Sequence, residues 1–147
     1  MLSRVRKVFT EYKEIKYLAY HDSLTGLLNR NWLYKNIDDI NHNYVYFIDI
    51  NDLKEYNKKG HTFGDMHIRR VIEEISYFLE PNDILIRYAG DEFVLFSDNE
   101  NAIRTERDFA VGKCVINSSN ITVDIVSAIR LADSDMIQSK ENYKNKK

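Results

Sequence analysis

The sequence has a single cysteine, no long apolar run and almost no net charge, and each of these absences excludes a class of protein. Cys114 is the only cysteine among the 147 residues. One cysteine excludes an internal disulfide and the paired-cysteine spacing of a zinc site. Because Cys114 lies in an apolar stretch, we interpret it as a small core residue.

The N-terminal twenty residues carry charges throughout and lack the apolar run of a signal peptide or a membrane-spanning helix. This pattern predicts a cytoplasmic protein with no membrane partner. The formal net charge of −2 provides no electrostatic attraction to nucleic acid, so no nucleic-acid partner is expected. Any nucleotide must therefore bind at a local site.

The composition is that of a folded domain, with 44% hydrophobic and 30% charged residues in a length typical of one domain. We expect an N-terminal helix over residues 1–20 and one domain over residues 21–147. Apolar residues at three- and four-residue steps give this helix one apolar face: Val5, Val8, Tyr12, Ile15 and Ala19. The preferred interpretation is that this face packs on the domain, and the alternative is a short dimerisation helix.

Periodicity along the rest of the chain predicts an α/β (α+β) domain, with helices covering a mostly antiparallel central sheet. Further helices are expected at residues 30–41, at 51–57 as one turn, from 65 to about 80 before Pro81, at 99–110 and at 132–143. Strands are expected at residues 44–50, 84–88, 92–97, 113–117 and 121–130. Residues 58–65 are expected to form a polar loop.

Two acidic strand ends are the strongest indication of chemistry. Asp49 ends a strand predicted to be buried on both faces, and Asp91 and Glu92 lie at the tip of a predicted hairpin. If the hairpin pairs beside the first strand, the three carboxylates converge, which is costly unless a cation lies among them. Oxygen ligands suit Mg²⁺. Taken singly, each acid is better explained as a turn or surface residue, so the prediction depends on their joint placement.

The segment after Asp49 passes from the strand into a helical turn. The N–H groups of Asn51, Asp52 and Leu53 would cradle phosphate oxygens there, as the first N–H groups of a helix do. Lys54 follows as a nearby positive charge. By itself this is a weak signal, because turns from strand to helix are common.

Four ordered motifs give the chain a clear resemblance to a known family. DSLTGLLNR at 22–30 resembles D-x-L-T-G-L-x-N-R, and DINDLK at 49–54 with Asn57 resembles D-[IL]-D-x-F-K-x-x-N. GHTFGD at 60–65 matches G-H-x-x-G-D, and RYAGDEF at 87–93 resembles R-x-G-G-D-E-F. Ala132-Asp133 followed by Lys140 is a weaker echo of the closing motif. The chain thus resembles a GGDEF-family diguanylate cyclase domain with a palm-like nucleotide cyclase fold.

The resemblance implies condensation of two GTP molecules into cyclic di-GMP with release of pyrophosphate, across a homodimer that is stable or transient. It implies Mg²⁺ (or Mn²⁺) held by Asp49, the Ile50 carbonyl, Asp91 and Glu92. The catalytic residues it implies are Glu92, Asp91 and Lys54. The substrate-binding residues it implies are Asn57, Asp65, Asp52, Leu53, Gly90, Lys140 and Lys144.

The chain also departs from the family pattern. Ala89 replaces the first glycine of the signature, which would strain the backbone if that position needs a positive φ. One residue is missing between Asn57 and Gly60, which would displace Asn57 from the base. Glu80 replaces the arginine of the family's R-x-x-D product site, so feedback through that site is not expected. Two alternatives therefore stay open: a weak or inactive GTP-binding module, and a related cyclase that makes another cyclic dinucleotide.

Overall fold

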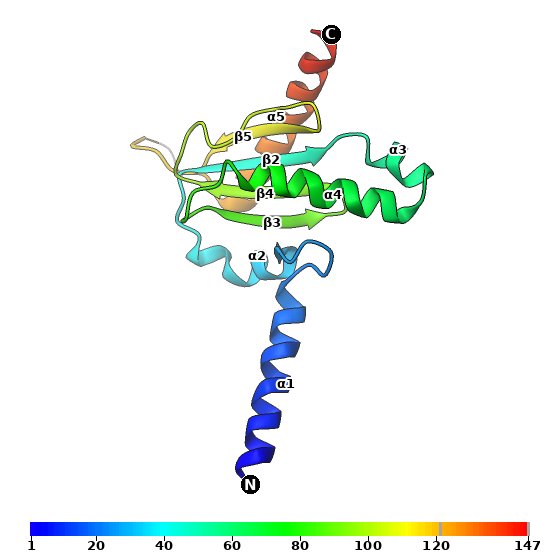
Figure 1. Ribbon diagram of the computed structural model, residues 1–147. Coiled ribbons are helices and arrows are strands. Elements are labelled where there is room, and N and C mark those ends of the chain that lie inside the picture. The colour runs from blue at the N-terminus through cyan, green and yellow to red at the C-terminus, as the bar shows by residue number, and fades with distance from the viewer. Residues whose placement is uncertain (121, 147) are drawn as a thin grey trace.

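One five-stranded sheet organises the computed structural model, which describes residues 1–120 and 122–146 (Figure 1). The strands are β1 (Leu28–Asn29), β2 (Tyr44–Ile50), β3 (Ile84–Ala89), β4 (Glu92–Ser97) and β5 (Phe109–Val115). Their order is β1-β3-β4-β2-β5, and only β1 and β3 pair in parallel. The helices are α1 (Leu2–Tyr20), α2 (Arg30–Asn36), η1 (Ile37–Asp39), α3 (Leu53–Lys58), α4 (His61–Ser76) and α5 (Ile125–Asn145). The predicted class, a mostly antiparallel sheet covered by helices, is confirmed.

The central strand β2 separates two hydrophobic cores. Tyr46, Ile48 and Ile50 face the core shared with α4, whereas Val45 and Phe47 face the core shared with α5. All five are at most 2% exposed. Burying each such side chain contributes roughly 1.5–3 kcal/mol, so the apolar run anchors the strand that ends at Asp49. The prediction of a strand buried on both faces is confirmed.

Helix α4 begins earlier and ends earlier than predicted. Its buried face is the one expected from the periodicity, with Ile68, Val71 and Ile75 in the core. The sequence predicts a polar loop for the first turn, from His61, because its exposed side chains lack an apolar period. Gly60, at a φ of 131°, starts the helix.

The C-terminal third differs most from the prediction. No helix lies at residues 99–110 and no strand at 122–130; β5 instead begins at Phe109, and α5 begins at Ile125. The Asp124 carboxylate starts α5 by accepting a hydrogen bond from the Ser127 N–H at 3.0 Å. The predicted strand over 121–130 also includes residue 121, which lies outside the described residues.

Helix α5 packs closely on the sheet because Gly112 of β5 has no side chain. A Cβ atom at this position would lie 2.0 Å from the Ala132 carbonyl oxygen and 2.1 Å from the Met136 nitrogen. Ala132 and Met136 are themselves buried against the sheet. The packing of α5 on β5 therefore outweighs the preference of Ile125 and Val126 for a β-strand, and both residues are helical.

Helix α1 projects away from the domain (Figure 1). None of its residues is buried, and Val5, Val8, Tyr12 and Ile15 are each more than 60% exposed. The preferred interpretation, that this face packs on its own domain, is therefore wrong. Within the part of the chain that the structure describes, no helix is both long and apolar enough to cross a membrane.

Candidate active site

The tip of the β3–β4 hairpin lies beside the end of β2. Asp49 pairs with Glu92 in the antiparallel register of β2 and β4, and the Ile50 N–H donates to the Asp91 carbonyl oxygen at 2.9 Å. The sheet therefore brings together two chain segments that are more than 40 residues apart. The predicted convergence of the two acidic strand ends is confirmed.

Arg87 holds the hairpin tip in place. Its Nε and Nη2 donate to the Gly90 carbonyl oxygen at 3.1 and 2.8 Å, and its Nη1 donates to both Asp22 carboxylate oxygens at 2.9 and 3.0 Å. Burial opposes ionisation of Asp22, but hydrogen bonds from Thr25 and from Arg87 outweigh it and hold the pKa of this carboxyl below its ordinary value. The motif at 22–30 thus supports the acidic turn through the contact of Asp22 with Arg87.

Negative charge accumulates at this end of the sheet. Burial, and then the charges of Asp91, Asp133 and Asp49, raise the pKa of Glu92. Burial also raises the pKa of Asp49, with further contributions from Asp91 and Asp133, although Lys140 opposes the shift. Asp133 reaches this cluster from α5, a position that the sequence showed only as part of a weak motif echo. Such clustered carboxylates favour a bound cation.

The cation nearest Asp49 is the Lys140 ammonium of α5, which donates to Asp49 Oδ1 in a partly buried ion pair. Lys140 was expected to contact phosphates. Among residues 1–120 and 122–146, no three Asp, Glu, His or Cys side chains are grouped so that they could hold a metal ion. The acidic strand ends converge as predicted, but the expected gathering of three carboxylate side chains is not present.

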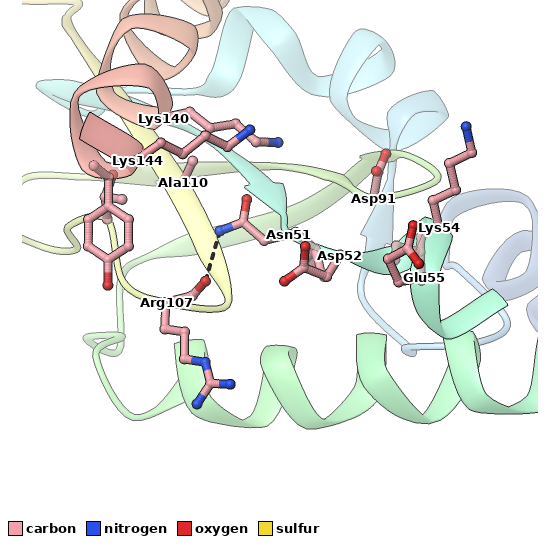
Figure 2. Close-up of a pocket in the computed structure, with 13 residues that line it drawn as sticks. Asn51, Asp52, Lys54, Glu55, Asp91, Arg107, Ala110, Lys140 and Lys144 are labelled. Atoms are coloured by element: carbon pink, nitrogen blue, oxygen red, sulfur yellow. Dashed lines mark hydrogen bonds between the residues drawn. The ribbon is translucent and has the colours of Figure 1, made fainter. Parts of the chain in front are cut away.

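A pocket of about 430 Å³ opens between the turn after β2, the hairpin tip and α5 (Figure 2). Its volume is in the range of small-molecule sites. Several predicted site residues line it: Ile50, Asp52, Leu53, Lys54, Asp91, Lys140 and Lys144. In Figure 2, Lys140 and Lys144 extend from α5 on one side, and Asp91 and Lys54 lie on the other. The pocket therefore joins acidic and basic side chains from distant parts of the chain.

Five lining residues are not predicted from the sequence: Glu55, Thr105, Arg107, Ala110 and Tyr143. Thr105 and Arg107 belong to the segment that was expected to be helical and instead runs as a loop into β5. No local sequence pattern relates Thr105 and Arg107 to the residues after β2. Their loop reaches the pocket because β5 pairs with β2.

The turn after β2 is held by contacts from its surroundings. The Asn51 N–H donates to the Asp108 carbonyl oxygen at 2.8 Å, so the expectation that it faces phosphate is wrong. Asp52 adopts the left-handed conformation, with a φ of 62°, and precedes α3. The N–H groups at the start of a helix have no carbonyl partner within it. Asp52 and Leu53 thus remain the candidates for phosphate contact.

A family model described as "Diguanylate cyclase, GGDEF domain" matches residues 19–107. The chain belongs to the GGDEF family. Probable diguanylate cyclase DgcT of Escherichia coli is 28% identical over 95% of this chain, and cyclic di-GMP phosphodiesterase PdeR of the same species is 37% identical over 59%. The chain spans only 37% and 14% of the lengths of these two relatives.

The crystal structure of the coiled coil and GGDEF domain of DgcB from Caulobacter crescentus has the same fold. Its TM-score is 0.76 at 19% identity, with 96% of this chain and 91% of that chain covered. At this identity the likeness supports the GGDEF fold alone.

The AGDEF variant causes no backbone strain in this GGDEF domain. Among the described residues, positive φ angles occur only at Asp52, Gly26 and Gly60, so neither Ala89 nor Gly90 requires glycine for its conformation. A Cβ atom at Gly90 would have no neighbour within 4 Å. The concern that Ala89 would distort the hairpin is therefore removed, and open space remains beside Gly90.

The two residues expected to read guanine lie outside the pocket lining but close to one another. The Asn57 amide of α3 lies against Gly64 of α4, the residue that precedes Asp65. Asn57 and Asp65 are both exposed. The missing residue before Gly60 has therefore not separated Asn57 from the G-H-x-x-G-D motif.

Gly64→Ala is expected to weaken GTP binding by roughly tenfold while the domain stays folded. The added Cβ would lie 1.8 Å from Asn57 Oδ1 and 2.8 Å from its Cγ, so the amide must move. The loss of one or two hydrogen bonds to a base corresponds to about this change in affinity. Calorimetric titration with GTP measures it, and Glu73→Ala on the exposed face of α4 is the control. Unchanged affinity in Gly64→Ala would remove Asn57 from base recognition.

Proposed function

We propose that this GGDEF domain is a cytoplasmic diguanylate cyclase that condenses two GTP molecules into cyclic di-GMP and releases pyrophosphate. One observation carries the proposal: the pairing of Asp49 with Glu92, beside a pocket lined by Asp91, Lys54, Lys140 and Lys144. Carboxylates for a metal and lysines for a triphosphate thus lie together, as nucleotidyl transfer requires.

The donor atoms suit a hard divalent cation, Mg²⁺ or Mn²⁺, although the side chains of the described residues are not grouped around one in this structure. We assign its ligands to Asp49, Asp91, Glu92 and the Ile50 carbonyl, all oxygen donors. The Lys140 ammonium pairs with Asp49 in this structure, so this ion pair must open before Asp49 can bind the metal. When bound, the metal neutralises charge on the triphosphate and favours ionisation of the attacking 3′-hydroxyl.

Glu92 is proposed to accept the proton of the 3′-hydroxyl. Its raised pKa lies closer to neutral pH than that of an ordinary glutamate, which makes it a better proton acceptor. Asp91, the residue before Glu92, and Lys54 line the pocket. Lys140 and Lys144, with the Asp52 and Leu53 N–H groups, would bind the phosphates. Gly90 would admit the nucleotide, because no atom lies within 4 Å of its missing side chain.

The base would be selected by Asn57 and Asp65. A carboxylate accepts hydrogen bonds from the N1–H and amino group of guanine, a donor pair that adenine lacks. This favours GTP over ATP. A cyclase of another cyclic dinucleotide would instead show adenine-containing product when both nucleotides are supplied.

Two domains must face one another, since each would hold one GTP. The exposed apolar face of α1, formed by Val5, Val8, Tyr12 and Ile15, supports a homodimer held at least partly through this helix. A single helix of 19 residues with no buried side chain gains little stability from its own domain.

Incubation with GTP and Mg²⁺, followed by mass spectrometry, tests the proposed function. We expect cyclic di-GMP and pyrophosphate, with a specific activity that rises with protein concentration because the reaction needs two domains. The absence of any cyclic dinucleotide at high protein concentration would reject the cyclase. GTP binding without turnover would favour the second candidate, a regulatory GTP-binding module, which the Asp49–Lys140 ion pair also supports.

A further inference from the structure

We propose that His67 is a positioning residue, which fixes the turn at 50–53 from behind so that its N–H groups face the triphosphate. The inference rests on the proposed function of the pocket. His67 lies outside the four family motifs and does not line the pocket. It would therefore act through the residues that it contacts, without lining the pocket itself.

The turn needs external support because its conformation is strained. Asp52 is the only residue other than glycine with a positive φ in the described parts of the chain. The left-handed conformation costs about 1 kcal/mol for a residue with a side chain, and it persists where the surroundings hold it.

His67 supplies part of this support from within the domain. The side chain is buried, and its Nε2 lies 2.8 Å from the Asn51 carbonyl oxygen. Its ring stacks on Tyr56 of α3, with ring centroids 3.9 Å apart and planes 12° apart. One side chain of α4 thus contacts both the turn and the short helix that follows it.

The partners of His67 determine which ring nitrogen carries hydrogen. Arg70 Nη2 lies 3.0 Å from Nδ1, and a guanidinium group can only donate. Nδ1 must therefore accept, so Nε2 carries the hydrogen and donates to the Asn51 carbonyl oxygen. Both ring nitrogens of His67 therefore have a hydrogen-bond partner.

Arg70 closes the network on the other side of the turn. Its Nη1 donates to the Asp108 carboxylate at 3.1 Å, and the Asp108 carbonyl oxygen accepts from the Asn51 N–H at 2.8 Å. His67 and Asp108 therefore hold the carbonyl and the N–H of Asn51, and Arg70 links them. The Asn51 carbonyl and the Asp52 N–H share one planar peptide unit, so holding the carbonyl sets the direction of the Asp52 N–H at the start of α3.

The test compares nucleotides with and without the outer phosphates. His67→Phe keeps the stacking on Tyr56 but loses both hydrogen bonds, whereas His67→Gln keeps an N–H donor. Titrations use GTP and GMP with Ca²⁺ in place of Mg²⁺ to limit turnover. We expect His67→Phe to weaken GTP binding by roughly tenfold and GMP binding by less than twofold, with His67→Gln closer to the wild type.

His42→Phe is the matched control. His42 Nε2 also lies 2.8 Å from a backbone carbonyl oxygen, that of Asn82, but it precedes β2 and so lies at the opposite end of the strand from Asp49. This variant should bind GTP and GMP as the wild type does. If His42→Phe weakens GTP binding to a similar extent, the loss reflects the general stability of the domain rather than the turn at 50–53. That result would overturn the inference.

A second measurement needs no nucleotide. ¹⁵N NMR of the histidine rings should show His67 as the Nε2–H tautomer, and an Nδ1–H tautomer would overturn the inference even if His67→Phe fails to fold. Equal loss of GTP and GMP binding, or no loss, would overturn it while the proposed function stands. If the wild type binds neither nucleotide, the proposed function fails and this inference fails with it.

Discussion

Glu92→Gln is expected to lower cyclic di-GMP formation by roughly 10²–10⁴-fold while leaving the domain folded, because the amide accepts no proton at neutral pH. Asp91, Asp133 and Asp49 all disfavour the charged form of Glu92. The substitution removes this carboxylate from the group. Initial rates with GTP and Mg²⁺ measure the loss. Glu141→Gln, on the exposed face of α5, is the control and should retain full activity.

The same substitution is expected to stabilise the domain at neutral pH. The native state binds the Glu92 proton more tightly than the unfolded state does, because its pKa is raised above the ordinary value of 4.5. The stabilising contribution of this group is therefore complete below about pH 4.5 and is lost as the pH rises through the raised pKa. Glu92→Gln avoids this loss, so we expect Tm at pH 7 to rise by roughly 1–4 °C.

Thermal melts from pH 4 to pH 8 measure the effect of Glu92→Gln on stability, whereas initial rates measure its effect on activity. The difference in Tm between the variant and the wild type should grow with pH. Full activity in the variant would remove Glu92 from the proposed proton transfer. A Tm that is lower than that of the wild type at pH 7 would show that the neighbouring acids do not destabilise the ionised carboxylate.

Arg87→Met is expected to destabilise the domain by about 2–3 kcal/mol and to lower activity by at least tenfold. The methionine keeps the apolar stem but loses the hydrogen bonds to the Gly90 carbonyl and to Asp22. Asp22 then loses its cationic partner in a partly buried setting, where each side chain of the pair is less than 20% exposed. Denaturant unfolding measures the loss of stability. Arg87→Lys should recover only part of it, because an ammonium cannot hold both partners in the same way.

The pH dependence of Arg87→Met distinguishes the ion pair from general packing. The pKa of Asp22 is held below 3.8 in the native state, so its contribution to stability is present above that pH and is lost as the pH falls through the lowered pKa. The stability difference between wild type and Arg87→Met should therefore shrink in acid. Arg104→Met, at an exposed ion pair, is the control and should change stability by less than 1 kcal/mol. A difference that stays constant with pH would contradict the role of the pair.

The elements predicted correctly have strong local signals. The run at 44–50 is apolar enough to be buried on both faces wherever it pairs, and the turn between β3 and β4 is marked by Gly90. The spacing of apolar residues along α4 correctly predicted which face of the helix is buried. The C-terminal third lacked such signals: Phe109 to Val115 becomes a strand because β2 offers it a free edge, and α5 starts at the Asp124 cap in spite of β-branched residues.

By itself, the sequence determined the family motifs, the central strand and the acidic hairpin, because these depend on residue type and short spacing. Only the tertiary structure decided which groups meet. Lys140 pairs with Asp49 across 91 residues, Arg87 joins Gly90 to Asp22, and the Asn51 N–H is held by Asp108. Contacts between distant segments depend on strand order and helix packing, which no local pattern encodes.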